Sequence, residues 1–332
     1  MSKLDTQQLN NLFPAIISAS RSTDIPAFYS DWFVNRWRAG FIKWKNNFSG
    51  KLYKINFDKT RVVVFWTKNP KPMFKHLDFL DKNIPNYYFQ FTLNDYVDEK
   101  FELSVANVEK RIKIFKTLSK KLGKKRVIWR FDPLILTDKI DVNKLLRKVE
   151  NIGNELKDYT TKLVFSFADI SIYKRVEYNL KKDDVKYIEF TDSTMHEFAS
   201  GLQKLNNNWG FEIATCTEKI ALEQYGIKHN KCIDDDLMID IFKEDKQLMK
   251  YLGAELDMFT NKITKTKNMK DKGQRKNCGC IIAKDIGQYH TCPHGCNYCY
   301  ANSSKEYAKI NFKLHKQNPN SSTITGDIDA RV

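Results

Sequence analysis

Long apolar stretches are absent from this sequence of 332 residues. Without a run of about 18 apolar residues, we expect neither a membrane-spanning helix nor a membrane partner. The first residues, MSKLDTQQLNNLF, also lack the basic-then-apolar pattern of a secretory signal. We therefore expect the protein in the cytoplasm.

A glycine-rich dinucleotide motif is also missing, because no GxGxxG follows any apolar run. Apolar, β-rich runs such as AIISAS, RVVVFWT and YYFQFTL instead alternate with helical stretches, about seven times along the chain. Runs that are apolar on both faces are typical of a parallel sheet covered by helices. With this length and this number of repeats, a (β/α) barrel is favoured over an open doubly wound sheet.

Acidic residues are few compared with basic ones: 40 Asp and Glu stand against 56 Lys and Arg, a net charge of +16. This excess suits a polyanionic partner such as nucleic acid. Trp37 and Trp44, aromatic residues near basic ones, are expected to be exposed and would suit stacking on bases. The alternative is that the lysine excess reflects A/T-rich coding.

Polar residues gather where the predicted strands end, which is where a barrel carries its chemistry. They are Ser20, Arg21 and Asp24; Thr67, Lys68 and Asn69; Gln90, Thr92 and Asn94; Arg130 and Asp132; Ser166; Cys216 and Glu218. Arg130 and Asp132 are two residues apart on a strand, so they face the same side and can pair, as a structural pair or as a clamp on a charged ligand. Four of these residues, Arg21, Asp24, Arg130 and Asp132, are the candidate catalytic residues.

The seven cysteines do not suggest a disulfide framework, because their number is odd and they all lie between residues 216 and 299. Five of them fall within CGCIIAKDIGQYHTCPHGCNYCYAN. Clustered thiols in a reducing compartment indicate a metal or an iron–sulfur cluster.

Three of these cysteines, Cys292, Cys296 and Cys299, have the spacing CxxxCxxC. Three thiolates can hold three corners of a [4Fe–4S] cube and leave the fourth iron open, although a structural zinc knuckle is the alternative. The spacing, with Tyr298 before the third cysteine, resembles the motif of radical S-adenosylmethionine (SAM) enzymes. In that superfamily SAM binds the open iron, and reductive cleavage of SAM releases a 5′-deoxyadenosyl radical. The resemblance implies a [4Fe–4S] cluster and SAM as cofactors, Tyr298 against the adenine, and an electron donor of flavodoxin or ferredoxin type.

The position of this motif differs from the superfamily pattern, in which it follows the first barrel strand. Here only residues 300–332 come after it, so the upstream strands must supply the barrel. We therefore predict a circularly permuted barrel, with DIGQY as the first strand, 292–299 as its loop and SSKEYAKINFKLH as its helix. The domain would span residues 1–314, and residues 315–332 are expected to be a disordered tail.

Almost the whole chain resembles the bacterial family known as domain of unknown function 1848. The segments that carry this resemblance are SRSTDIPAFYSDW, VVFWTKNP, YYFQFTLN, VIWRFDPLIL, CID at Cys232 and CGC…DIGQYHTCPHGCNYCYAN. A fainter similarity connects it with spore photoproduct lyase, a radical SAM enzyme of DNA repair, through strands that end in Thr67-Lys68 and in Thr92 and Asn94. That similarity implies that Lys68, Thr92 and Ser20, with Asn94 beside them, hold the methionyl end of SAM.

Four cysteines remain: Cys216, Cys232, Cys278 and Cys280. Four thiols are the number that fills a closed site, holding zinc or a second [4Fe–4S] cluster. The alternative is isolated buried thiols. His290 and His294 flank the three-cysteine loop, and we interpret them as neighbours of the site or solvent-facing residues, not as ligands.

The sequence thus predicts a radical SAM enzyme that acts on nucleic acid, in repair or modification. One alternative is a radical SAM enzyme for a peptide or small metabolite. Another is a zinc-stabilised nucleic-acid-binding protein without catalysis.

Overall fold

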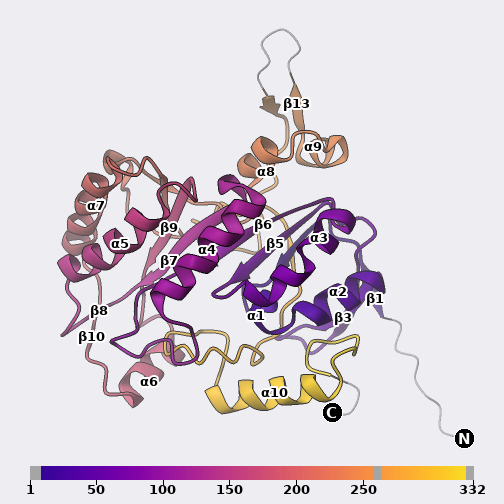
Figure 1. Ribbon diagram of the computed structural model, residues 1–332, viewed down its shortest axis with the longest axis horizontal. Helices are drawn as coiled ribbons and strands as arrows, with labels where there is room; N and C mark the ends of the chain where they lie inside the picture. Colours follow the sequence, from indigo (N-terminus) through magenta and orange to yellow (C-terminus); the bar gives the residue numbers. More distant parts are fainter. Residues whose placement is uncertain (1–8, 257–262, 327–332) are drawn as a thin grey trace, which may run out of the picture.

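An eight-stranded sheet forms the centre of the computed structural model, which describes residues 9–256 and 263–326 (Figure 1). The strand order is β12–β11–β9–β7–β6–β5–β2–β15, and every neighbouring pair is parallel. The strands are β2 (Ile16–Ala19), β5 (Val62–Thr67), β6 (Asn86–Thr92), β7 (Val127–Leu134), β9 (Lys162–Phe167), β11 (Glu212–Thr215), β12 (Ile227–His229) and β15 (Lys284–Asp285). The predicted mostly parallel α/β fold is confirmed.

The sheet is open, whereas the sequence predicts a closed barrel. Within residues 9–256 and 263–326, the edge strands β12 and β15 each pair with one neighbour only, β11 and β2. These edge strands have three and two residues, so they offer few backbone groups for closure. β15 nevertheless lies parallel to β2, followed by the cysteine loop and α10, in the order expected of a permuted first βα unit.

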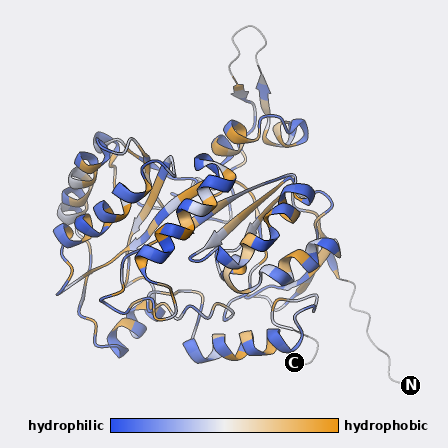
Figure 2. Ribbon diagram, in the orientation of Figure 1, coloured by the Kyte–Doolittle hydropathy of each residue, from blue (hydrophilic) through white to orange (hydrophobic). Residues whose placement is uncertain are grey.

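Helices cover one face of the sheet, and Figure 1 shows α4 and α5 in front of it. The amphipathic pattern of both helices is visible in Figure 2, where hydrophilic and hydrophobic residues alternate along them. Each begins at a side-chain cap, because Asn107 and Asp141 accept hydrogen bonds from the first-turn backbone N–H groups of Lys110 and Lys144. The helices are α1 (Ile25–Phe28), α2 (Ser30–Arg38), α3 (Leu77–Asn83), α4 (Val108–Leu122), α5 (Val142–Leu156), α6 (Lys174–Lys182), α7 (Asp192–Asn206), α8 (Asp235–Ile241), α9 (Lys246–Leu252) and α10 (Lys305–Gln317).

The opposite face of the sheet packs against the segment made of residues 232–252 and 278–281, which come between β12 and β15 in the chain. Strand residues Ile16, Val64 and Ile128 share a buried cluster with Ile233 and Met238 of this segment. In a closed barrel this face would be buried by its own strands. Here the segment buries it, so the sheet needs no closure to remove its apolar side chains from water.

The smaller elements complete the chain. A three-stranded sheet has the order β1–β4–β3, and two strand pairs are β10–β8 and β13–β14. Their bounds are β1 (Asn10–Leu12), β3 (Phe41–Lys45), β4 (Leu52–Asn56), β8 (Leu136–Thr137), β10 (Tyr187–Ile188), β13 (Ala254–Leu256) and β14 (Ile263–Lys265), with 3-10 helices at Lys71–His76, Lys124–Arg126 and Glu223–Tyr225. In the part of the chain that the structure describes, no helix has the length and apolarity to cross a lipid bilayer.

The segment after His315 is packed against the fold, in contrast to the predicted disordered tail. Helix α10 continues to Gln317, and Trp32 Nε1 donates to the Ser321 carbonyl at 2.9 Å. The backbone N–H of Lys43 donates to the Ser322 carbonyl at 2.8 Å, so α10 and its extension lie beside the N-terminal elements (Figure 1). The remainder of the predicted tail, residues 327–332, lies outside the described residues.

Candidate metal and cofactor centre

The predicted site residues gather at the carboxyl edge of the sheet. Because the strands are parallel, their carboxyl ends share one edge, the usual place for a ligand site in such a fold. Ser20 follows β2, Lys68 follows β5, Thr92 ends β6, and Cys216 follows β11. The three-cysteine loop begins a few residues after β15 and reaches the same edge.

The three-cysteine loop is fastened to residues 101–104. The backbone of Cys296 forms an antiparallel bridge with that of Glu102. On either side of this bridge, the Asn297 N–H donates to the Phe101 carbonyl at 2.9 Å, and the Ser104 N–H donates to the His294 carbonyl at 3.0 Å. The loop therefore has a defined path between β15 and α10.

The thiols of Cys292, Cys296 and Cys299 lie close enough to influence one another's pKa. Burial raises the pKa of all three thiols. The pKa of Cys296 rises to about 12, although Lys68 opposes the rise. For Cys292 and Cys296, the neighbouring sulfurs raise the pKa further. A bound cation reverses this effect, because a thiol that coordinates metal loses its proton. The donor set therefore fits a metal group whose positive charge holds the three thiolates.

A buried ionic network lies directly beside this loop. Lys68 Nζ is 2.7 Å from Glu102 Oε1 and donates to the Tyr298 hydroxyl at 2.8 Å. Tyr298 donates a short hydrogen bond to Glu102 and accepts one from Asn94 Nδ2 at 2.9 Å. Arg111, whose side chain is fully buried, is 3.3 Å from the second carboxylate oxygen of Glu102.

Charge balance in this network keeps Glu102 ionised. Burial alone would raise the pKa of Glu102, but Lys68 and Arg111 outweigh it and leave that pKa below its usual value. The pKa of Lys68 is raised, because Glu102 more than offsets the effect of burial. Tyr298, expected to lie against an adenine, has its hydroxyl held in this network.

Asp24 joins three parts of the site. Its Oδ1 accepts from the Ala27 N–H and so caps α1, while its Oδ2 accepts from the Lys68 N–H at 2.7 Å. The same Oδ2 is 2.8 Å from Nε2 of His294, a side chain that is buried and not solvent-facing. Asp24, a predicted catalytic residue, thus positions the end of β5 and the cysteine loop relative to each other.

Ser20 and Arg21 are connected to the end of β15. Ser20 Oγ donates to Asp285 Oδ1 at 2.7 Å, and the Arg21 N–H donates to Asp285 Oδ2 at 2.9 Å. Ser20 thus bonds to the sheet edge, and its role in holding SAM stays a prediction. Thr92, the other predicted hydroxyl ligand, is half-buried and lies opposite Arg130 in the β6–β7 register.

The remaining four cysteines meet at the same edge, next to β7 and β11. Cys216 Sγ and Cys232 Sγ are 3.4 Å apart, and the Cys232 N–H lies 3.3 Å from Cys280 Sγ. The Cys280 thiol also lies close enough to those of Cys232 and Cys278 to lower their pKa values. Four thiols from three chain segments therefore form one continuous chain of contacts, which we call the four-cysteine group.

Arg130 connects the predicted Arg–Asp pair to this group. It forms a short ion pair with Asp132, which also receives a hydrogen bond from Ser166, and its Nη1 donates to Cys232 Sγ at 3.1 Å. Hydrogen bonds from Cys216 and Cys280, together with Arg130, place the pKa of Cys232 well below that of an ordinary thiol despite its burial. The carboxylate of Asp132 therefore accepts hydrogen bonds from both Arg130 and Ser166.

Arg21 interacts with both cysteine-containing regions. Its guanidinium lies over the Trp66 ring, which Arg130 also contacts, with distances of 5.5 and 5.2 Å to the ring centroid. Burial alone would lower the pKa of Arg21, but the negative charges of Cys280, Asp285 and Cys232 outweigh this effect. The pKa of Arg21 is therefore above its usual value. Its carbonyl accepts a hydrogen bond from Tyr300, one residue beyond Cys299, at 2.9 Å.

Residues 16–301 match the family described as domain of unknown function (DUF1848). The chain belongs to the DUF1848 family. The match includes every strand of the large sheet and all seven cysteines. No curated protein and no solved structure gives a significant match, so the similarity to spore photoproduct lyase stays a prediction.

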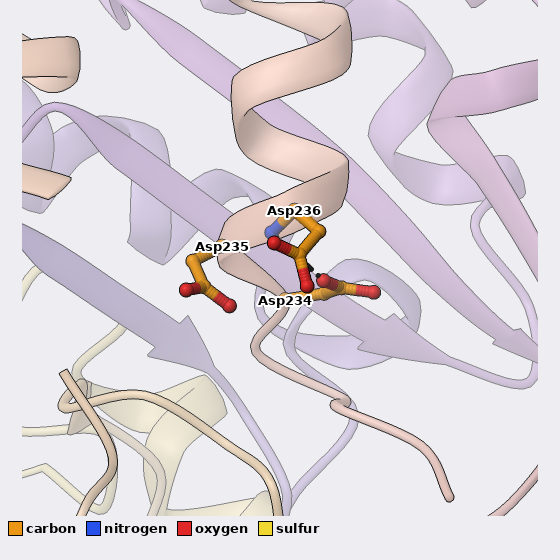
Figure 3. A group of neighbouring side chains, drawn as sticks. All are labelled: Asp234, Asp235 and Asp236. Carbon is orange, nitrogen blue, oxygen red and sulfur yellow. Dashed lines mark hydrogen bonds between the residues drawn. The ribbon is translucent and has the colours of Figure 1, made fainter. Parts of the chain in front are cut away.

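A separate acidic group in this DUF1848 protein lies at the start of α8, where Figure 3 shows Asp234, Asp235 and Asp236 side by side. Among the described residues, only these three bring three potential ligand atoms within 4.8 Å of one another. Lysines already balance them: Lys231 and Lys265 each contact Asp235 and Asp236, and Lys162 contacts Asp234. The group therefore needs no cation.

The two tryptophans considered for base stacking are not free. Trp37 stacks on Phe57 at a ring-centroid distance of 4.9 Å and donates to the Asn83 carbonyl. Trp44 donates to the Gly287 carbonyl at 2.7 Å, and Lys284 lies over its ring. The prediction that these are exposed stacking surfaces is therefore wrong.

Three residues of the site escaped the sequence analysis: Glu102, Arg111 and Asp285. Glu102 lies in a polar stretch without a motif, and it reaches the site through its backbone bridge to Cys296. Arg111 points inward from α4, where its spacing among Ile114, Phe115 and Leu118 marks a buried helix face. Asp285 ends β15, and its position at a strand end was the one available signal.

Proposed function

We propose that this DUF1848 protein is a radical SAM enzyme, in which Cys292, Cys296 and Cys299 would hold a [4Fe–4S] cluster. The observation that carries the proposal is a set of three neighbouring thiols, one buried and two partly buried, beside Lys68 at the carboxyl edge of a parallel sheet. Three thiolates leave one iron open, and a cluster of this kind supplies the electron for reductive cleavage of SAM. An electron donor of flavodoxin or ferredoxin type would reduce it.

Residues of this chain would orient the methionyl part of SAM. An ammonium group has three donors, and Glu102 and Tyr298 take two of those of Lys68, which leaves one for a carboxylate. Asp24 fixes the backbone of Lys68 and, through His294, the cysteine loop. The methionyl carboxylate of SAM would therefore meet a cation whose position is set from two sides.

Zinc is the competing occupant of the loop, and a spectrum separates it from iron. After anaerobic reconstitution with iron and sulfide, we expect broad visible absorption from thiolate-to-iron charge transfer. Calorimetric titration should then show SAM binding to the reconstituted protein and not to the metal-free protein. A colourless protein that holds zinc and does not bind SAM would contradict the proposal.

Replacing Lys68 tests the proposed SAM contact. Lys68→Ala should weaken SAM binding about ten- to a hundredfold, since a charge-assisted hydrogen bond contributes roughly 1.5–3 kcal/mol. Iron content should not change, because Lys68 is not a cluster ligand. Lys75→Ala, which removes an exposed lysine paired with Asp31, is the matched control. Unchanged affinity in the Lys68 variant, measured by calorimetry, would remove this residue from the SAM site.

We propose nucleic acid as the substrate class, and the net charge of +16 is what supports it. Binding that depends on phosphate contacts should weaken by orders of magnitude between about 50 and 200 mM salt. Fluorescence anisotropy with a labelled oligonucleotide measures this dependence. Absence of binding at the lower salt concentration would favour a peptide or a small metabolite instead.

A further inference from the structure

We propose that the four-cysteine group, Cys216, Cys232, Cys278 and Cys280, binds an iron–sulfur cluster of its own, of [4Fe–4S] type. This inference is independent of SAM chemistry, because it concerns cysteines outside the 292–299 loop. It rests on the convergence of the thiols, the donors directed at their sulfurs, a close backbone approach and the spread of the sulfurs.

Convergence brings together residues that are far apart in the sequence. Cys216 follows β11, Cys232 precedes α8, and Cys278 and Cys280 lie shortly before β15. The sulfurs of Cys216 and Cys232 are 3.4 Å apart, and Cys280 receives the Cys232 N–H at 3.3 Å. Cys232, Cys278 and Cys280 are each at least nine-tenths buried.

The donors around these sulfurs suit thiolates. Arg130 Nη1 and Asn230 Nδ2 each donate to Cys232 Sγ at 3.1 Å. The backbone N–H groups of Cys232 and Ile233 donate to Cys280 Sγ at 3.3 and 3.4 Å. A neutral thiol is a weak acceptor, whereas hydrogen bonds to cysteine sulfur are a regular feature of iron–sulfur sites. Four N–H donors on two sulfurs therefore suit thiolates better than neutral thiols.

A glycine allows the Cys-x-Cys segment to approach the Cys232 loop. A Cβ at Gly279 would lie 2.9 Å from Lys231 Cγ and 3.2 Å from the Asn230 carbonyl oxygen. The second contact is with backbone, which cannot move aside as a side chain can. Any larger residue would therefore push Cys278 and Cys280 away from Cys232.

Apart from the Cys216–Cys232 pair at 3.4 Å, the spread of the sulfurs favours a cluster over a single ion. Four thiolates around one zinc at about 2.3 Å would be about 3.8 Å apart. Over residues 9–256 and 263–326, however, no three cysteine sulfurs lie within 4.8 Å of one another. Sulfurs spread in this way fit the corner ligands of a [4Fe–4S] cube better than one tetrahedral ion, and cluster binding would separate the Cys216–Cys232 pair. Arg130, in contact with Cys232, and Arg21 place two guanidinium groups where they offset the thiolate charge.

The test uses a variant in which the four-cysteine group is intact. In the triple variant Cys292→Ala/Cys296→Ala/Cys299→Ala, reconstituted anaerobically, we expect about four iron and four sulfide per chain, half of the wild-type content. Chemical iron and sulfide assays, with the visible spectrum, measure this. A triple variant without iron, or a colourless one with zinc, would overturn the assignment.

A complementary variant addresses the same group in the presence of the 292–299 loop. Gly279→Ala should lower the iron content to about half of wild type and leave the first cluster in place. Retention of full iron by Gly279→Ala would also count against the proposal. Failure of SAM cleavage alters neither result, because both readouts are metal content. The two proposals can therefore fail separately.

Discussion

Loss of any one of Cys292, Cys296 and Cys299 is expected to abolish SAM cleavage. Each alanine substitution removes one of three protein ligands. A cluster held by only two thiolates would have two irons without a protein ligand, so no single iron would be set apart to bind SAM. Activity is measured as 5′-deoxyadenosine released under dithionite, and it should fall below detection in each variant.

The matched control for these variants is Ser193→Ala, a substitution of similar size at the exposed start of α7. It should retain wild-type activity and wild-type iron content. If a cysteine variant formed 5′-deoxyadenosine at the wild-type rate, its cysteine would not be a ligand of the catalytic cluster.

Removal of Glu102 should destabilise the fold by about 3–5 kcal/mol, the usual cost of breaking a buried ion pair. Glu102→Ala would leave Lys68 and Arg111 as two buried cations without a shared partner, and it would free the Tyr298 hydroxyl. The free energy of unfolding from urea titration of the protein measures this effect.

Glu155→Ala is the control for the Glu102 variant, because Glu155 forms an ion pair with Lys116 and has a side chain that is 54% exposed. Exposed pairs of this kind contribute less than about 1 kcal/mol. Equal stability losses in the two variants would mean that the network around Glu102 does not hold the cysteine loop in place.

The parallel sheet could be predicted because its strands are buried on both faces and read as continuous apolar runs, as in VVVFWT of β5. Strand ends then located most of the polar residues that the structure brings together, including Lys68, Asn94 and Arg130. Local sequence was sufficient there, since a strand and the residue after it are neighbours in both chain and space.

The open edge and the buried network could not be predicted, because both depend on long-range contacts. Closure fails where residues 232–252 and 278–281 cover the second face of the sheet, and nothing in their composition shows which surface they pack on. Glu102 reaches the site by a backbone bridge across almost 200 residues of chain. The packing of residues 318–326 likewise depends on Trp32 and Lys43, at the other end of the sequence.

The most direct test of the proposed radical chemistry is product analysis of the reconstituted wild-type protein with SAM and dithionite in the absence of oxygen. The account predicts 5′-deoxyadenosine and methionine from the wild type, and neither product from the triple variant that lacks Cys292, Cys296 and Cys299. Wild-type protein that carries its full iron and sulfide, and binds SAM, yet forms no 5′-deoxyadenosine would contradict it.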